Sequence, residues 1–453
     1  MLLHSLLVLA FTTREITWKE IGVQKMDVSF SAKKLRPSAT LAINELITLL
    51  RERGEQILHL GFGESPFPVH RLVRDALCEN SWRQKYLSTQ GIPPLREEIS
   101  GFYQKMFGLQ YAPEQIVVGP GSKPLMFAAL AALDGPIFLP APSWVSYQHM
   151  GKYLDRDIHH IPTRVDESYR LNPQALLDAI EHNFPDPAQQ KILVLNYPCN
   201  PTGHSFSAQQ LKALANVARE QNIVVVSDEI YALTHFRDQE HHSISKFYPE
   251  GTLVTGGLSK DRSLGGYRLG VLLLPAEEKT LLRSILAVGS EIWSSVSAPI
   301  QYAGIEAYRT DTELVAYIRD CASVHELAIR YVHRRLEAGE ISCPRPMGGF
   351  YLFPDWNKHK NALREQGINT SGELAQHLLK NRLVSSLPGS EFGMSPNHLS
   401  LRLAAVDYDG QTAIESFMKD KDSAFEDPDR FVISIAPNLV KASEQLIDFT
   451  TGL

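Results

Sequence analysis

Between residues 115 and 275, short apolar runs alternate with amphipathic stretches, and this alternation constrains the fold more than any other feature of the chain. Helix-like segments separate several of the runs; one of them, Ser207–Glu220, opens with a serine suited to an N-cap. Strands that alternate with helices predict an α/β fold, with a mostly parallel sheet covered by helices on both faces. Ligands of such sheets bind at the carboxyl ends of the strands. The predicted strands are Gln115–Val118, Pro136–Leu139, Ile192–Asn196, Ile223–Ser227, Leu253–Thr255 and Leu269–Leu274.

A second, smaller α+β domain is predicted from the two ends of the chain. Helices are expected over Ala39–Arg53 and Leu314–Glu337, and short strands and helices follow residue 340. The predicted large domain spans residues 69–304. The predicted small domain combines residues 27–68 with 305–453.

The remaining terminal segments carry little functional information. Met1–Phe11 is apolar, but eleven residues are too few to span a bilayer. No Lys or Arg precedes this run and no clear A-x-A site follows. Residues 1–26 are therefore expected to be an extension outside the fold, or Met26 is expected to be the true start, rather than the run being a secretory signal. The charged stretch Lys419–Arg430 is predicted to be a solvated surface, and the tail after Gly410 has no assigned role.

Composition narrows the class of protein. Of the 453 residues, 43% are apolar and 21% charged, which is typical of a soluble globular chain with a large core. A net charge of −6 argues against a nucleic-acid-binding surface. The cysteines form no CxxC pair and show no metal-ligand spacing, so we expect reduced thiols, no metal and a cytoplasmic location. They are Cys78, Cys199, Cys321 and Cys343.

Lys260 lies in a run of small residues that follows the predicted strand Leu253–Thr255, and Arg268 lies eight residues further on. A lysine that forms a Schiff base with a cofactor aldehyde needs space and a setting that keeps part of its amine neutral. A phosphate-bearing cofactor also needs a fixed guanidinium nearby. A surface lysine in a glycine-rich turn would give the same local pattern.

Two acidic residues end the predicted strand Ile223–Ser227. Asp228 at a strand's carboxyl end can keep a pyridine nitrogen protonated, and the hydroxyl of Tyr231 can reach the phenolic oxygen of the same ring. If the strand alternation continues, Glu229 points the other way. The alternative for Asp228 is an N-cap of the following helix.

Asn200 follows the predicted strand Ile192–Asn196, within an Asn-Pro-Thr-Gly turn. Its amide, held by Pro201, can bond the phenolic oxygen of a bound pyridine ring. Trp144 follows the strand Pro136–Leu139, and its planar indole suits stacking on such a ring, although a core tryptophan is the commoner case.

Gly121, Ser122 and Lys123 open a predicted helix after the strand Gln115–Val118. A helix N-terminus with small residues is an anion site, and a phosphate there would face Arg268. Arg402 lies between apolar residues, where a planar two-pronged donor suits a carboxylate. The residues around Tyr86 give no physical reason to assign it a role.

Together these segments resemble the class I (fold-type-I) pyridoxal-phosphate-dependent aminotransferases, from about Pro37 to Asp407. They are most similar to the bacterial aspartate aminotransferase subgroup, through the runs Pro37–Thr40, Gly61–Glu64 and Pro142–Tyr147.

The resemblance implies a role for each motif residue. Lys260 would form the Schiff base and shuttle a proton, Asp228 would pair with the pyridine nitrogen, and Arg402 would clamp the substrate α-carboxylate. Gly63 would approach the substrate through its backbone, and Tyr86 would reach the phosphate of a neighbouring subunit in a homodimer. The remaining implied cofactor contacts are Asn200 and Tyr231 to the phenolic oxygen, Trp144 to the ring, and Gly121, Ser122, Lys123 and Arg268 to the phosphate.

Two positions qualify this transfer of roles. Part of the family has a serine three residues before the lysine, and because Gly257 stands there, the phosphate contact is missing or moves to Ser259. Lys123 and Thr40 match the residues that meet a second substrate carboxylate in the aspartate subgroup. The expected substrates are therefore aspartate, or another acidic or aromatic amino acid, with a 2-oxo acid such as 2-oxoglutarate.

Two alternative functions follow from the same residues. The first is a lyase of the same fold, such as a carbon–sulfur β-lyase or an aminocyclopropane-carboxylate synthase relative, because the cofactor contacts are shared. The second is a regulatory protein, which would carry a DNA-binding domain ahead of this fold. The acidic chain and the short segment before residue 37 argue against the second alternative.

Overall fold

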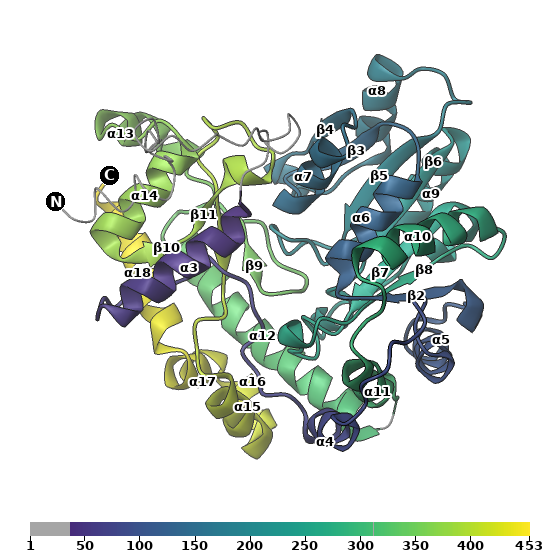
Figure 1. The fold of residues 1–453 in the computed structure, drawn as a ribbon. Helices are drawn as coiled ribbons and strands as arrows, with labels where there is room; N and C mark the ends of the chain where they lie inside the picture. Colours follow the sequence, from purple (N-terminus) through teal and green to yellow (C-terminus); the bar gives the residue numbers. More distant parts are fainter. Residues whose placement is uncertain (1–36, 311) are drawn as a thin grey trace, which may run out of the picture.

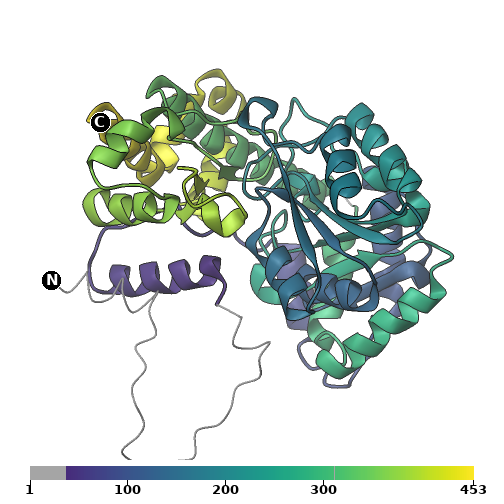
Figure 2. The same cartoon turned by 90° about the horizontal axis from the view of Figure 1, so that it is seen from above.

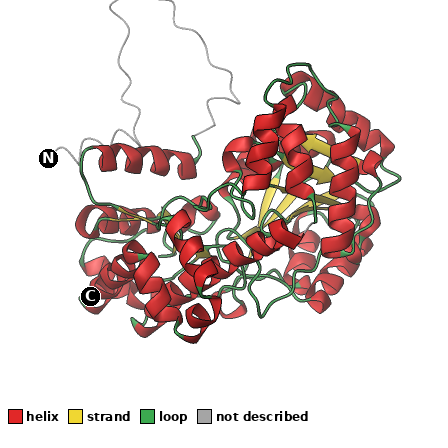
Figure 3. Cartoon of the chain, turned by 90° about the horizontal axis from the view of Figure 1, so that it is seen from below, coloured by secondary structure: helices red, strands yellow, loops and turns green. Residues whose placement is uncertain are grey.

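The computed structural model describes residues 37–310 and 312–453, which form two lobes (Figure 1). The larger lobe holds a seven-stranded sheet with helices on both faces, and the smaller lobe is mostly helical (Figure 3). The expectation for residues 1–26 lies outside the described residues. The boundaries drawn at residues 69 and 304 stay a prediction.

The large sheet has the strand order β2-β8-β7-β6-β5-β3-β4. β8 runs antiparallel to β2 and β7, and the other neighbours are parallel. The predicted α/β fold with a mostly parallel sheet is confirmed, and all six predicted strands are found within two residues of their expected bounds. The strands are β2 (Ile116–Gly119), β3 (Ile137–Ala141), β4 (Ile158–Pro162), β5 (Lys191–Asn196), β6 (Ile223–Asp228), β7 (Thr252–Gly257) and β8 (Gly270–Leu273).

The one strand of this sheet that the sequence analysis missed is β4. It reads Ile-His-His-Ile-Pro and pairs only with β3 at the sheet edge, so most of its residues are partly exposed. Central strands such as β5 and β7 are buried along their whole length and therefore form continuous apolar runs. An edge strand has no such requirement, and His159 and His160 interrupt the apolar pattern.

Alternate residues of the strands pack against two helical layers. In β8, Leu272 contacts the cluster formed with α6 and α10, whereas Val271 and Leu273 contact the cluster formed with α5 and α11. Ser207 caps α9 as expected: its Oγ accepts a bond from the Gln210 amide at 3.3 Å. The helices of this lobe are α4 (Arg71–Asn80), α5 (Pro93–Phe107), α6 (Ser122–Ala132), α7 (Val145–Tyr153), α8 (Pro173–Asn183), α9 (Ala208–Glu220), α10 (Lys279–Ile292) and α11 (Ala298–Tyr308).

The smaller lobe combines both ends of the described chain, and α3 lies on its outside (Figure 2). Its strands form a parallel pair, β1 with β10, and a three-stranded antiparallel sheet, β11-β12-β9. The two predicted helices are confirmed as α3 and α12. The elements are α3 (Ala39–Glu52), β1 (Leu58–His59), α12 (Thr312–Ala338), β9 (Tyr351–Leu352), α13 (Lys360–Glu365), α14 (Ser371–Arg382), β10 (Val384–Ser385), β11 (Leu387–Pro388) and β12 (Leu401–Ala404).

The tail after Gly410 forms four further helices that complete the core of this lobe. Leu446 and Phe449 belong to the same apolar cluster as Val332 and Leu336 of α12. The stretch expected to be only a solvated surface is helical, and its Lys421 pairs with Asp320 of α12 at 2.6 Å. The four helices are α15 (Gly410–Lys419), α16 (Lys421–Glu426), α17 (Pro428–Ile435) and α18 (Pro437–Thr451).

Short 3-10 helices occupy several connections, and one of them, η4, begins directly after Tyr231. Across the described parts of the chain, we find no helix whose length and apolar character would let it cross a membrane. The 3-10 helices are η2 (Pro113–Gln115), η3 (Val165–Glu167), η4 (Ala232–Thr234), η5 (Ile244–Lys246), η6 (Pro249–Gly251), η7 (Gly265–Tyr267), η8 (Asn357–His359) and η9 (Gly389–Phe392).

Candidate active site

A cavity of about 480 Å³ lies where the carboxyl ends of β5, β6 and β7 meet residues of the smaller lobe. This is the position that a parallel sheet favours for a ligand. The cavity brings together most of the residues singled out from the sequence. Its lining includes Thr40, Gly63, Ser122, Lys123, Trp144, Asn200, Asp228, Tyr231, Ser259, Lys260, Arg268 and Arg402.

Lys260 follows β7, and its amine lies inside this cavity. The Nζ atom donates a hydrogen bond to the carbonyl oxygen of Gly63 at 2.8 Å. Gly63 must be a glycine, because a Cβ there would lie 2.1 Å from the hydroxyl oxygen of Tyr351. The lysine is therefore not a surface residue of a glycine-rich turn.

Asp228 ends β6 and is only 3% exposed. The hydroxyl of Tyr147 donates to its Oδ2 at 2.7 Å, and the Ile230 amide donates to its Oδ1 at 3.3 Å. Burial raises the pKa of this carboxyl to about 6, while hydrogen bonds and the charge of Lys260 oppose the rise. A buried carboxylate here favours a cationic partner in the cavity.

Asn200 is held by its backbone, whose amide donates to Asn196 Oδ1 at 2.7 Å. Its own Oδ1 is buried without a hydrogen-bond partner among the described residues. The Tyr231 hydroxyl lies 3.0 Å from the hydroxyl of Tyr351. The Asn200 amide and the Tyr231 hydroxyl can therefore form further hydrogen bonds with a ligand in the cavity.

The N-terminus of α6 forms the anion-binding part of the site. Gly121 is its N-cap with φ of 95°, and a Cβ there would lie 2.4 Å from Arg268 Nη2. The Arg268 guanidinium is held by the Gly265 carbonyl oxygen at 2.8 Å. Lys123 lies next along the helix, and burial, with Arg268 and Lys260 nearby, lowers its pKa.

Arg402 on β12 faces the cavity from the smaller lobe and is only 1% exposed. One Nη atom donates to the Gly61 carbonyl oxygen, and the guanidinium lies 4.8 Å from the centre of the Tyr351 ring. Its Nε is buried without a hydrogen-bond partner among the described residues. Burial lowers its pKa from the ordinary value.

The cavity carries an excess of positive charge. Across residues 37–310 and 312–453, no carboxylate forms an ion pair with any of its four cationic side chains. An anionic ligand would therefore find partners that the chain itself leaves open. The four are Lys123, Lys260, Arg268 and Arg402.

Three further predicted residues take distinct positions. Thr40 opens α3 at the cavity, where its Oγ1 lies 2.7 Å from Ser38 Oγ. Trp144 is half-buried and lies edge-on to Tyr147. Tyr86 is 92% exposed and does not line the cavity. The structure therefore does not bring Tyr86 to this chain's own site.

Sequence reasoning assigned no role to Tyr147, Asn196 or Tyr351, although each contacts a predicted site residue. Tyr147 follows Trp144 by one helical turn, and Asn196 ends the strand that precedes Asn200. Those spacings were signals that could have identified both. Tyr351 has no local signal, because it reaches the cavity from the smaller lobe.

Comparison with known proteins agrees with this geometry. Residues 55–411 match the family described as aminotransferase class I and II. The chain is 31% identical to the aspartate aminotransferase of Geobacillus stearothermophilus, across 86% of this chain and 98% of that protein. It is 29% identical to the aspartate/prephenate aminotransferase of Cereibacter sphaeroides, across 82% and 92% of the two chains.

The fold is also similar to that of a solved relative. The aspartate aminotransferase of Thermus thermophilus with maleate superposes with a TM-score of 0.79 at 26% identity, covering 94% of this chain and all of that one. The family match, the similarity to these relatives and the cavity at the strand ends lead to one conclusion: this chain belongs to the class I and II aminotransferases.

Proposed function

We propose that this aminotransferase uses pyridoxal phosphate to exchange the amino group between an L-amino acid, aspartate or another acidic or aromatic one, and a 2-oxo acid such as 2-oxoglutarate. The observation that carries the proposal is that Lys260 and Arg402 share one cavity. The first is an amine at a strand end, and the second is a buried guanidinium with an open Nε. Together they suit a substrate with an amino group and a carboxylate on one carbon.

The residues present fit pyridoxal phosphate, which the family implies. The Lys260 amine suits its aldehyde, and the α6 N-terminus with Arg268 suits its phosphate. Buried Asp228 suits a protonated ring nitrogen. Asn200 and Tyr231 line the same cavity, and the amide nitrogen of the first and the hydroxyl of the second are donors that would bond the ring's phenolic oxygen.

In the proposed mechanism the chain orients the substrate and moves one proton. The bound cofactor would supply an electron-withdrawing ring. Arg402 would hold the α-carboxylate through two parallel N–H bonds, which fixes the Cα–H bond in direction. Lys260 Nζ, which donates a hydrogen bond to the Gly63 carbonyl oxygen, would take the proton from the substrate Cα.

Substrate preference in this proposal depends on the other residues that line the cavity. Lys123 and Thr40 line the same cavity and offer a cation and a hydroxyl to a side-chain carboxylate. Leu41, Phe62 and Ile230 add apolar surface, which suits an aromatic side chain. Both classes of amino acid therefore remain in the proposal.

We also propose a homodimer, because Tyr86 does not line the cavity of its own chain and would contribute to the site of a partner subunit. Tyr86 is 92% exposed and Trp82 is 71% exposed. Ile292, at the end of α10, is 57% exposed. Large aromatic and aliphatic side chains on a surface favour burial against another chain.

The test is a half-reaction screen across amino acids that follows the visible absorption band of the cofactor-loaded enzyme. Aspartate should bleach the band fastest, and 2-oxoglutarate should restore it. Lys123→Gln should slow the reaction with aspartate about 10- to 100-fold more than the reaction with phenylalanine, because a charge-assisted bond to the side-chain carboxylate is lost. Pyruvate and ammonia formed without a 2-oxo acid would instead establish a lyase.

A further inference from the structure

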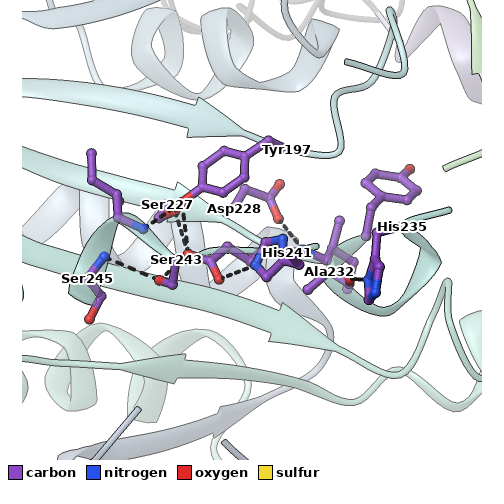
Figure 4. Close-up of polar contacts among 12 residues, drawn as sticks. Tyr197, Ser227, Asp228, Ala232, His235, His241, Ser243 and Ser245 are labelled. Carbon is purple, nitrogen blue, oxygen red and sulfur yellow. Dashed lines mark hydrogen bonds and ion pairs between the residues drawn. The ribbon is translucent and has the colours of Figure 1, made fainter. Parts of the chain in front are cut away.

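At the end of β6, the side chains of two neighbouring acidic residues point to opposite sides of the strand. Asp228 faces the cavity, whereas Glu229 does not line it and is 4% exposed. Figure 4 shows Tyr197, Ser227, His241 and Ser243 gathered beside Asp228 at this strand end. The expected alternation of Asp228 and Glu229 therefore holds in the structure.

Glu229 receives four hydrogen bonds from buried side chains. Its Oε1 accepts from Ser243 Oγ at 2.6 Å, from Ser227 Oγ at 2.8 Å and from the Tyr197 hydroxyl at 3.2 Å. Its Oε2 accepts from His241 Nε2 at 2.9 Å. These hydrogen bonds, which come from several parts of the chain, hold the carboxyl group of Glu229 in one orientation.

The charge of this cluster follows from the contacts of His241. Its side chain and that of Glu229 are each 1% exposed. The Nδ1 atom of His241 has no partner among the described residues, and an imidazolium would leave a buried N–H without an acceptor there. Neutral His241, donating from Nε2, leaves a net negative charge on Glu229. In the described chain no Lys or Arg pairs with that carboxylate.

The negative charge acts on the neighbouring residue. Burial is the main cause of the raised pKa of Asp228. The charge of Glu229 raises this pKa further, whereas the charge of Lys260 lowers it. Burial keeps the pKa of the tyrosines facing the two carboxylates above its ordinary value, so they stay neutral near pH 7. The titratable groups facing the pair are Tyr103, Tyr111, Tyr147, Tyr197, Cys199, Tyr231, His241 and Lys260.

We propose that Glu229 is a positioning residue for the reaction: its buried charge, held in place by hydrogen bonds, supplements Asp228 in favouring a cationic ring nitrogen. This inference rests on the proposed function, because it assigns the ring nitrogen of pyridoxal phosphate to Asp228. Neither Glu229 nor any of its four donors lines the cavity, so the network acts on the site through the neighbouring Asp228.

The experiment compares E229Q with wild type, using cofactor-free protein titrated with pyridoxal phosphate. Glutamine keeps the shape and removes the charge, so the Kd for the cofactor should rise about tenfold. The pH midpoint of the visible band should move, because the ring nitrogen and Asp228 lose a neighbouring negative charge. The kcat should fall while the KM for the amino acid stays within about twofold.

Two variants separate charge from structure. S243A removes one donor but keeps the Glu229 charge, and D320N removes a buried carboxylate from α12, outside the cavity. Both should lose stability in urea and keep the wild-type Kd and pH midpoint. The inference is overturned if E229Q loses stability but keeps those values, or if S243A moves them equally. A wild type that fails to bind pyridoxal phosphate would instead reject the proposed function.

Discussion

Single residues in this chain acquire their chemistry from the groups around them. Lys260, Arg268, Lys123 and Arg402 are ordinary cations in the sequence, yet all four line one cavity without a paired carboxylate in the described chain. Asp228 is the buried acid among them. Four cations and two carboxylates, Asp228 and Glu64, line the cavity, so its net positive charge favours an anionic ligand, and buried Asp228 favours one positive centre in it.

The first prediction concerns Lys260. Lys260→Ala should abolish the visible absorption band that pyridoxal phosphate gives with the wild type, because no other amine is placed at Gly63 among the described residues. Transamination should fall by at least about 10³-fold, since both the covalent attachment and the proton transfer are lost. Absorption spectra and steady-state rates measure both effects. An unchanged band in the variant would contradict the assignment.

The second prediction links Asp228 to stability. Its folded pKa of about 6 lies above that of an exposed aspartate, so the folded, cofactor-free protein holds a proton that the unfolded chain releases. The unfolding free energy should therefore fall as the pH rises from about 4 to about 6. Asp228→Asn should remove this pH dependence of the unfolding free energy. At pH 8 and without cofactor, the variant should be more stable than wild type by about 2–3 kcal/mol.

Urea denaturation of the cofactor-free proteins at pH 5 and pH 8 measures this difference. With pyridoxal phosphate added, the order should reverse, because the wild type binds the cofactor more tightly and binding stabilises the folded state. A variant that is less stable than wild type at pH 8 without cofactor would show that the Tyr147 hydrogen bond outweighs burial.

At the scale of elements, the strand ends decide where the chemistry lies. β5, β6 and β7 are adjacent and parallel, so Asn196, Asp228 and the loop to Lys260 end at the same edge of the sheet. The apolar runs identified these strands because central strands are buried on both faces. The apolar runs did not identify β4, because an edge strand tolerates polar residues.

The third prediction concerns α18, whose role could not be read from the sequence. Leu446 is fully buried in the cluster that includes α12, so Leu446→Ala should lower the unfolding free energy by about 2–5 kcal/mol. Lys441→Ala, at an exposed position of the same helix, is the matched control and should change it by less than about 0.5 kcal/mol. Chemical denaturation measures both. Equal stability of the two variants would mean that α18 is not part of the core.

At the scale of the whole molecule, the site requires both lobes. Arg402 and Tyr351 come from the smaller lobe, while Lys260, Asp228 and Lys123 come from the larger one. A movement of one lobe against the other would change the distance between the carboxylate clamp and the amine. Thr40 belongs to α3, which lies on the outer side of the smaller lobe, so Thr40 would move with that lobe (Figure 2).

The fourth prediction tests the proposed homodimer. Tyr86→Phe should raise the dissociation rate of pyridoxal phosphate about tenfold, because one hydrogen bond to a charged group would be lost across the interface. The far-ultraviolet spectrum and the dimer mass should stay unchanged. Tyr153→Phe, another exposed tyrosine at 52%, is the matched control. If both variants retain the cofactor like wild type, Tyr86 does not reach a partner's site.

The sequence by itself determined the strand pattern, the family and the motif residues that follow each strand. These are local properties, since the apolar runs, the turn prolines and the glycines act over a few residues. Only the tertiary structure decided that Tyr147 bonds Asp228, that Tyr351 meets Tyr231, and that the tail completes a core. Those contacts join residues 81, 120 and about 110 positions apart, and packing, rather than any local pattern, brings such residues together.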